Sequence, residues 1–111
     1  MLKLNVSKTK HFAKLVKKLS KKYHNIENDI DDFLDSIEKI EDLGIKLGSN
    51  LYKARIKNTD NNKGKSAGFR LITYLQVTEN ELTMIYIYSK SEMENINETV
   101  LDNIILNNFN K

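Results

Sequence analysis

The chain reads Leu51-Tyr52-Lys53-Ala54-Arg55-Ile56-Lys57 and, after a polar loop, Gly68-Phe69-Arg70-Leu71-Ile72-Thr73-Tyr74-Leu75-Gln76-Val77. The first segment alternates strictly between apolar and cationic residues, and a period of two is typical of a half-buried strand. Its polar side consists of three cations with no acid between them. Because a row of like charges adds no stability to a strand, we expect this side to face a polyanion or a solvated groove. Arg70 opens the next strand with a further cation.

Length and composition indicate an ordinary globular protein. The chain has 111 residues, enough for one modest core, and we expect a single domain over residues 1–111. It contains no Cys, which excludes a disulfide framework and a Cys-based zinc site. It has neither an apolar run long enough to span a bilayer nor the apolar core of a signal peptide. We therefore expect a cytoplasmic protein with no membrane partner.

The net charge of +3 hides an uneven distribution of charged residues. Residues 1–26 carry eight Lys and no acid, and residues 27–42 carry eight acids and one Lys. Residues 53–70 carry six cations and one acid. One interpretation of the first two blocks is mutual complementarity and solvation of neighbouring helices. The other is that the lysine-rich helix extends a nucleic-acid footprint.

Apolar spacing predicts the order of the elements. Residues 2–6 alternate as a short strand, and Ser7 is a plausible N-cap for a helix that places Phe12, Val16 and Tyr23 on one face. A second helix carries an apolar stripe from residue 26 to residue 40, with Gly44 as its C-cap. We expect these two helices to form an antiparallel hairpin.

Three strands at about 51–58, 68–77 and 81–89 then form a meander, with a tight turn at Glu79-Asn80. The segment Ser91-Glu92-Met93-Glu94 is a capping box that begins a final helix. The sequence therefore predicts an α+β domain. In it the N-terminal strand and helical hairpin pack on an antiparallel-rich meander sheet with a C-terminal helix.

Several motifs do not support a cofactor or metal site. Gly64-Lys65-Ser66 resembles the end of a phosphate-binding loop, but the pattern requires Gly where the chain has Thr59, and a strand follows instead of a helix. The acids between residues 29 and 35 lack the Gly of a calcium loop. His11 and His24 have no suitably spaced co-ligand. We expect no metal and no cofactor.

The loop of residues 58–67 is longer than most hairpin connections, and long loops are often functional. It contains Lys63 and Lys65 and directly follows Lys57. One interpretation is a solvated turn that carries Lys for solubility. Together with the cations of the two flanking strands, however, the loop favours a role in binding RNA, and we assign that role to these three lysines.

Three segments in combination resemble the RelE/ParE superfamily of bacterial type II toxins, closest to its RelE/HigB-like branch. They are Tyr52-Lys53-Ala54-Arg55-Ile56, Gly68-Phe69-Arg70-Leu71-Ile72-Thr73-Tyr74 and Ile85-Tyr86-Ile87-Tyr88-Ser89-Lys90-Ser91-Glu92. The resemblance implies the toxin component of a type II toxin–antitoxin system, a ribosome-dependent endoribonuclease that cleaves translated mRNA. It also implies a cognate antitoxin protein as partner, in addition to the ribosome and mRNA.

The resemblance also implies site residues. The cationic strand positions of the family fall on Lys53 and Arg55, its arginine after the glycine–aromatic pair on Arg70, and its basic position after the last strand on Lys90. Three positions depart from the best-studied branch. Arg55 replaces a lysine, Ser91 replaces an arginine, and Asn97 stands where that branch has a tyrosine, for which Tyr88 is a spatial substitute.

These residues suit metal-free attack by the ribose 2′-hydroxyl. The two arginines stay charged at any relevant pH and can clamp the phosphoryl oxygens. A lysine is a poor base at its unperturbed pKa of about 10.4, but neighbouring like charges lower that pKa. Lys53 and Lys90 are therefore the candidates for acid–base work. Because lysine is a poor base, cleavage is expected to be slow unless the ribosome positions the substrate.

Two other functions stay open. A non-catalytic ParE-type toxin that targets gyrase shares the fold, although that branch usually lacks the clustered cations. A basic RNA- or ribosome-binding module would show exposed aromatic side chains on the sheet for stacking bases. Tyr74, Tyr86 and Tyr88 could serve there, but they alternate with core residues and are more often structural.

Overall fold

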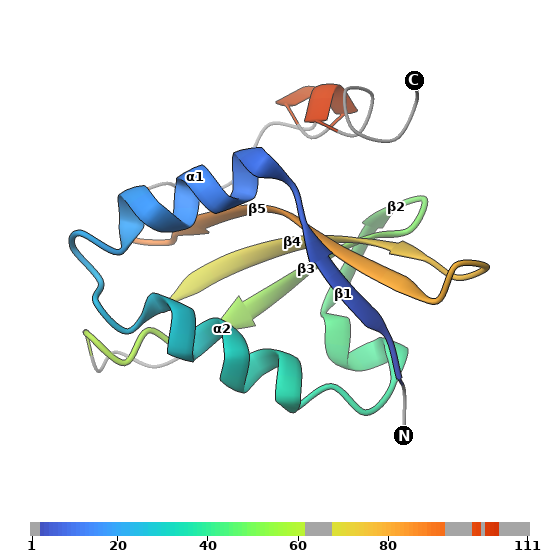
Figure 1. Cartoon of the computed structure of the whole chain (residues 1–111), viewed down its shortest axis with the longest axis horizontal. Coiled ribbons are helices and arrows are strands. Elements are labelled where there is room, and N and C mark those ends of the chain that lie inside the picture. The colour runs from blue at the N-terminus through green and yellow to red at the C-terminus, as the bar shows by residue number, and fades with distance from the viewer. Residues whose placement is uncertain (1–2, 62–67, 93–98, 101, 105–111) are drawn as a thin grey trace.

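The computed structural model describes residues 3–61, 68–92, 99–100 and 102–104. In this part of the chain one mixed sheet has the strand order β1-β5-β4-β3-β2, with the two helices of residues 10–19 and 26–35 on one of its faces (Figure 1). The parallel pair is β1 with β5, and the other pairs are antiparallel. The predicted α+β class and antiparallel-rich sheet are confirmed. The elements are β1 (Asn5–Lys8), α1 (Lys10–Leu19), α2 (Ile26–Asp35), the 3₁₀ helix η1 (Ile40–Leu43), β2 (Ile45–Gly48), β3 (Leu51–Ile56), β4 (Phe69–Gln76) and β5 (Glu81–Ser89).

The main core lies between the sheet and the helices α1 and α2. Phe12 and Val16 of α1 pack with Ile30 of α2 against Phe69 and Leu71 of β4. Figure 1 shows the two helices running in opposite directions along this face, as predicted. Since successive side chains of a strand point to opposite faces, the residue between Phe69 and Leu71 points to the other face of the sheet. The helices therefore cover one face and leave the other face to a different set of residues.

The second face of the sheet carries its own small apolar cluster. Leu51, Ile72 and Ile85 pack there with Ile104, one of the helical residues near the carboxyl end. The register of β4 and β5 shifts between Ile72 and Thr73, which pair with Tyr86 and Met84 and leave Ile85 as the extra residue of a bulge. The bulge lets Met84 join the helix-side core while Ile85 joins the cluster on the opposite face.

The start of the first helix differs from the prediction. Thr9 caps α1, and its hydroxyl oxygen accepts a hydrogen bond from the Phe12 N–H at 3.0 Å. Ser7, the predicted cap, lies inside β1, where its hydroxyl contacts that of Thr83 at 3.0 Å. The strand is shifted toward the helix because its pairing with β5 runs as far as Lys8 and Met84.

The second helix is shorter than predicted and ends at Asp35. The Ser36 hydroxyl donates to the Phe33 carbonyl at 2.6 Å and so takes up one of the last helical acceptors. The helix also has no basic residue in its last turn, so no cation offsets its dipole there. Ile37 stays buried, but the chain then turns through η1, which Gly44 terminates with a φ of 103°.

The strands are close to their predicted bounds, with one addition. The edge strand β2 was not predicted, because four residues are too few for their alternation to be distinguished from chance and most of them are exposed. The tight turn before β5 is confirmed by Asn80, whose φ is 52° and whose N–H donates to the Val77 carbonyl at 3.1 Å. The predicted capping box runs into residues 93–98, which lie outside the described residues. None of the helices in the described ranges has the length and apolarity that a bilayer span requires.

Gly44 offers a test of how η1 is joined to the sheet. Its φ of 103° disfavours any other residue, and a Cβ there would overlap the Lys53 carbonyl oxygen. We expect Gly44→Ala to lower the free energy of unfolding by roughly 1–3 kcal/mol through backbone strain alone. Urea unfolding measures this change. Gly48→Ala is the control, because a Cβ at Gly48 meets nothing within 4 Å, and equal losses in the two variants would contradict the prediction.

Candidate functional site

A row of three polar side chains crosses the middle of the sheet on the face away from α1 and α2. Arg55 of β3 is the direct partner of Arg70 in β4, and Arg70 is the direct partner of Tyr88 in β5. Cross-strand partners project from the same face, so the three side chains are neighbours. The next row on this face consists of Lys53, Ile72 and Tyr86. Four predicted site residues are thus brought together by the register of three strands.

Arg70 is the most constrained cation of this row. It is 6% exposed, and its guanidinium donates to the Phe69 carbonyl at 3.3 Å. Burial lowers the pKa of the Arg70 guanidinium, and the charge of Arg55 lowers it further. Arginine nevertheless stays charged in proteins. Two adjacent guanidinium groups, one buried and one exposed, therefore make a strongly positive point that an anion would stabilise.

Tyr88 closes the row on the side of β5. Its side chain is buried, and burial raises the pKa of the phenol above its ordinary value, whereas the cation of Arg70 opposes that rise. The neutral hydroxyl is consequently the form present at neutral pH. A neutral phenol next to a buried arginine can donate a hydrogen bond or a proton to an oxygen held by the two arginines.

The other predicted lysines occupy different places. Lys90 directly follows β5, is partly exposed, and its N–H donates to the Gly68 carbonyl at 2.9 Å, so it lies at the strand end next to the row. Lys57 follows β3 and lines a cleft of about 200 Å³ together with Arg55 and residues of α2. Lys63 and Lys65 lie outside the described residues.

The acidic cluster of α2 helps to hold the loop that follows β3. The Asp29 carboxylate is buried and accepts hydrogen bonds from the Thr59 N–H at 3.1 Å and the Thr59 hydroxyl at 2.9 Å. The Asp60 carboxylate accepts from the Asn25 N–H at 2.9 Å. These bonds attach the start of the loop to the amino-terminal end of α2, and so restrain the chain just beyond Arg55 and Lys57.

A hydroxyl network at the end of β5 was missed by sequence reasoning. The Tyr23 hydroxyl lies 3.3 Å from the Ser89 hydroxyl and donates to the Glu92 carboxylate at 3.3 Å, while Ser91 lies 2.9 Å from Ser89. The bond to Ser89, followed by that to Ser91, lowers the pKa of the Tyr23 phenol. The network flanks Lys90 on both sides. Tyr23 was assigned only to the helix-side core, and no local pattern links it to residues so far along the chain.

A second missed contact involves Tyr86, on the face of the sheet that carries the arginines. The His11 ring of α1 stacks on Tyr86, with ring centroids 5.8 Å apart and an angle of 28° between the planes. Tyr86 in turn lies 6.2 Å from Tyr88. The only signal in the sequence was the presence of aromatic residues at alternate positions of β5.

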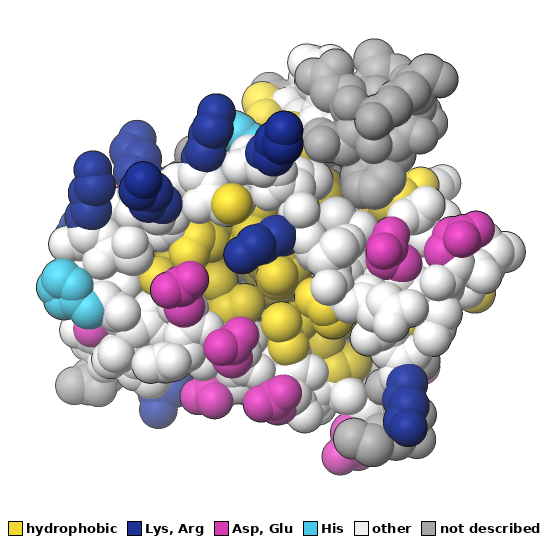
Figure 2. All heavy atoms as spheres, viewed as in Figure 1, with side chains coloured by type: hydrophobic (Ala, Val, Ile, Leu, Met, Phe, Trp, Pro, Cys, Tyr) yellow, Lys and Arg dark blue, Asp and Glu magenta, His cyan; other side chains and the backbone are white. Residues whose placement is uncertain are grey.

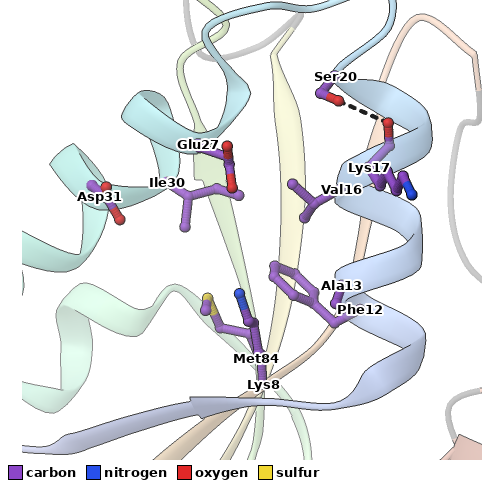
Figure 3. A pocket seen from close by; sticks show the side chains of 10 residues that line it. All are labelled: Lys8, Phe12, Ala13, Val16, Lys17, Ser20, Glu27, Ile30, Asp31 and Met84. Carbon is purple, nitrogen blue, oxygen red and sulfur yellow. Dashed lines mark hydrogen bonds between the residues drawn. The ribbon is translucent and has the colours of Figure 1, made fainter.

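The helix-covered face has a different character. Figure 2 shows apolar side chains between α1 and α2, with cations over α1 and acids over α2. A groove of about 270 Å³ lies there, and Figure 3 shows Phe12, Val16, Ile30 and Met84 at its base. No lysine of α1 forms an ion pair with an acid of α2 in the described structure, so direct pairing does not link these two charge blocks.

The electrostatic link between Arg70 and Tyr88 can be measured. Arg70→Met removes the cation that holds the Tyr88 pKa down, so we expect that pKa to rise further. Spectrophotometric pH titration follows the phenolate, and Tyr88→Phe identifies which part of the signal belongs to this residue. Lys46→Met is the control, because Lys46 pairs with Tyr52 and projects from the opposite face. A Tyr88 pKa that stays constant or falls in Arg70→Met would contradict the assignment.

Comparison with known proteins gives a consistent result. A sequence model described as the RelE toxin of the RelE/RelB toxin–antitoxin system matches residues 4–105. The isolated E. coli RelE toxin has a TM-score of 0.54 and 16% identity, over 92% of this chain and 96% of that chain. RelE in the intact E. coli RelBE complex has a TM-score of 0.52 and 16% identity, over 78% and 96% of the two chains.

A third structure, an arginine double mutant of E. coli RelE in complex with a peptide of the antitoxin RelB, has a TM-score of 0.52 and 15% identity over 93% of this chain and 94% of that chain. At such identities these likenesses establish the fold alone. A comparison with curated proteins gives no sequence match. The family assignment therefore rests on the sequence model, which covers most of the chain. This chain belongs to the RelE toxin family of type II toxin–antitoxin systems.

Proposed function

We propose that this toxin is a ribosome-dependent endoribonuclease that cleaves translated mRNA without a metal ion. The observation that carries the proposal is the row of Arg55, Arg70 and Tyr88 across three strands. A buried arginine beside an exposed one makes a strongly positive point on this face, and such a point attracts anions. RNA supplies such an anion at every phosphodiester. The family assignment supports the same conclusion, since the matching family consists of toxins.

The chemistry divides among the residues of this face. The ribose 2′-oxygen attacks phosphorus, its proton passes to a base, and the bond to the 5′-oxygen breaks as that oxygen takes up a proton. Arg55 and Arg70 bind the non-bridging oxygens, whose negative charge grows in the transition state. Tyr88, with its raised pKa, keeps a hydroxyl proton that can go to the leaving oxygen. Lys53 and Lys90 are the candidates for accepting the first proton.

The proposed partners follow from the family and the site. Solved structures of E. coli RelE with RelB contain a toxin and its antitoxin. For this chain we propose a cognate antitoxin, together with the translating ribosome and its mRNA as target. The proposed place of action is the cytoplasm, where translation occurs. Binding of an antitoxin over the row of arginines would block access of RNA to both guanidinium groups.

Transcript mapping tests the nuclease activity directly. When the chain is induced in a bacterium, we expect new mRNA ends within translated codons. Arg70→Ala should lower cleavage by about 100-fold or more, the loss typical of removing one group that stabilises transition-state charge. Lys46→Ala is the matched control, because it removes a cation on the opposite face. Growth arrest with DNA damage and intact mRNA would instead indicate a gyrase-targeting toxin, and absence of toxicity would indicate a binding module.

Lysine footprinting tests where the proposed antitoxin binds on this chain. The protein encoded beside this chain's gene is expected to bind the chain and to cover or distort the surface that carries Lys53 and Arg70. Acetylation of Lys53, read by mass spectrometry, should fall by about tenfold in the complex, because a buried amine reacts through rare openings. Labelling of exposed Lys17 and Lys39 in the same sample reports the general reactivity. Unchanged labelling of Lys53 in a formed complex would refute this placement.

A further inference from the structure

His11 lies beside the candidate site although it is far from it in sequence. The parallel pairing of β1 with β5 ends at Lys8 and Met84, and the Thr9 N–H donates to the Met84 carbonyl at 3.2 Å. The helix α1 starts at Lys10 and continues along the edge of β5 (Figure 1). The first turn of α1 is therefore held next to Tyr86, one residue after the bulge.

The rings form a strip that leads to the arginines. His11 stacks on Tyr86 at 5.8 Å, Tyr86 lies 6.2 Å from Tyr88, and Tyr88 is the cross-strand partner of Arg70. His11 is exposed, Tyr86 is partly exposed and Tyr88 is buried. The strip is consequently most accessible at its His11 end. Because His11 is exposed, its imidazole is not needed to fill the core.

The surroundings of His11 are cationic. Lys10 is its neighbour in sequence, Lys14 follows one helical turn later, and both are exposed. Clustered cations alone would attract any polyanion. Cations next to exposed aromatic rings are the combination that binds single-stranded nucleic acid, because phosphates meet the charges and bases stack on the rings. Binding of a protein partner would not require lysines and exposed rings on a path that leads to the two guanidinium groups.

We propose that His11 and Tyr86 form a nucleobase-stacking position of the candidate site. RNA bound with a phosphate at Arg55 and Arg70 extends along β5 toward α1, and a base one or more nucleotides from that phosphate stacks on the exposed imidazole. Lys10 and Lys14 contact the backbone on either side of this base. The inference rests on the proposed function for the identity of the substrate, and it adds a binding residue that the sequence did not indicate. His11 binds and positions the strand, and takes no part in the proton transfers.

The test is binding of a short fluorescein-labelled oligoadenylate at constant low salt, followed by fluorescence anisotropy. His11→Ala should weaken binding by about fivefold or more, which corresponds to roughly 1 kcal/mol, the lower end for loss of one base–aromatic stack. His11→Phe should bind like wild type, because a flat ring remains. His24→Ala is the matched control: His24 is also exposed and near α1, but it makes no ring contact within the described residues.

Abasic oligonucleotides separate stacking from charge. Removing one base at a time leaves every phosphate in place, so electrostatic attraction is unchanged. At one position the abasic site should weaken binding to wild type by the same factor as His11→Ala, and should have no further effect on that variant. Equal affinities of His11→Ala and His24→Ala for the intact RNA would overturn the proposal, as would additive losses at every abasic position. Matching thermal midpoints of the variants confirm that the fold is retained, and His11→Phe still tests the stack if His11→Ala is less stable.

The outcome also distinguishes this inference from the proposed function. If Arg70→Ala abolishes cleavage while His11→Ala binds RNA like wild type, the stacking position is wrong and the nuclease stands. If wild type shows the position-specific loss with abasic RNA but leaves translated mRNA intact, the nuclease is wrong and the stacking position stands.

Discussion

Arg55 and Arg70 face each other across two hydrogen-bonded strands, and the rest of the site is arranged around this pair. Like charges at directly opposed positions destabilise a sheet by some tenths of a kcal/mol, and burial of one of them adds a desolvation cost. The fold tolerates the repulsion and the desolvation cost because β4 is hydrogen-bonded to β3 and β5, and because its other face packs into the core around Phe69 and Leu71. An anion that binds between the two guanidinium groups would relieve the repulsion.

The two faces of the sheet carry different kinds of side chains. On one face, α1 and α2 bury the large apolar side chains that hold the strands in register. On the other face, the same strands present cations and tyrosines in rows, and the apolar cluster of Leu51, Ile72, Ile85 and Ile104 lies beside them. The bulge at Ile85 permits this division in β5, because it lets Met84 and Ile87 face the helices while Tyr86 and Tyr88 face the opposite side, which carries the candidate site.

Elements remote in the sequence complete the candidate site. Asp29 of α2 fixes the loop after β3, Tyr23 bonds to the hydroxyl groups on both sides of Lys90, and His11 stacks on Tyr86. Each contact joins a residue of the helical region to a segment next to the row of Arg55, Arg70 and Tyr88. A site built from strands is thereby supported at its edges by side chains of α1, α2 and the turn between them.

The sequence by itself determined the alternation of β3, the cations on its outer side and Arg70 at the start of β4, because a period of two depends only on neighbouring residues. It also determined the order of the first strand, the two helices and the three meander strands and, through three short motifs, the resemblance to the family. Only the tertiary structure decided that Arg55, Arg70 and Tyr88 are aligned, since register depends on where each strand begins to pair. The bulge, the edge strand β2 and the approach of His11 to Tyr86 likewise arise from pairing and packing between distant segments, for which a local pattern contains no signal.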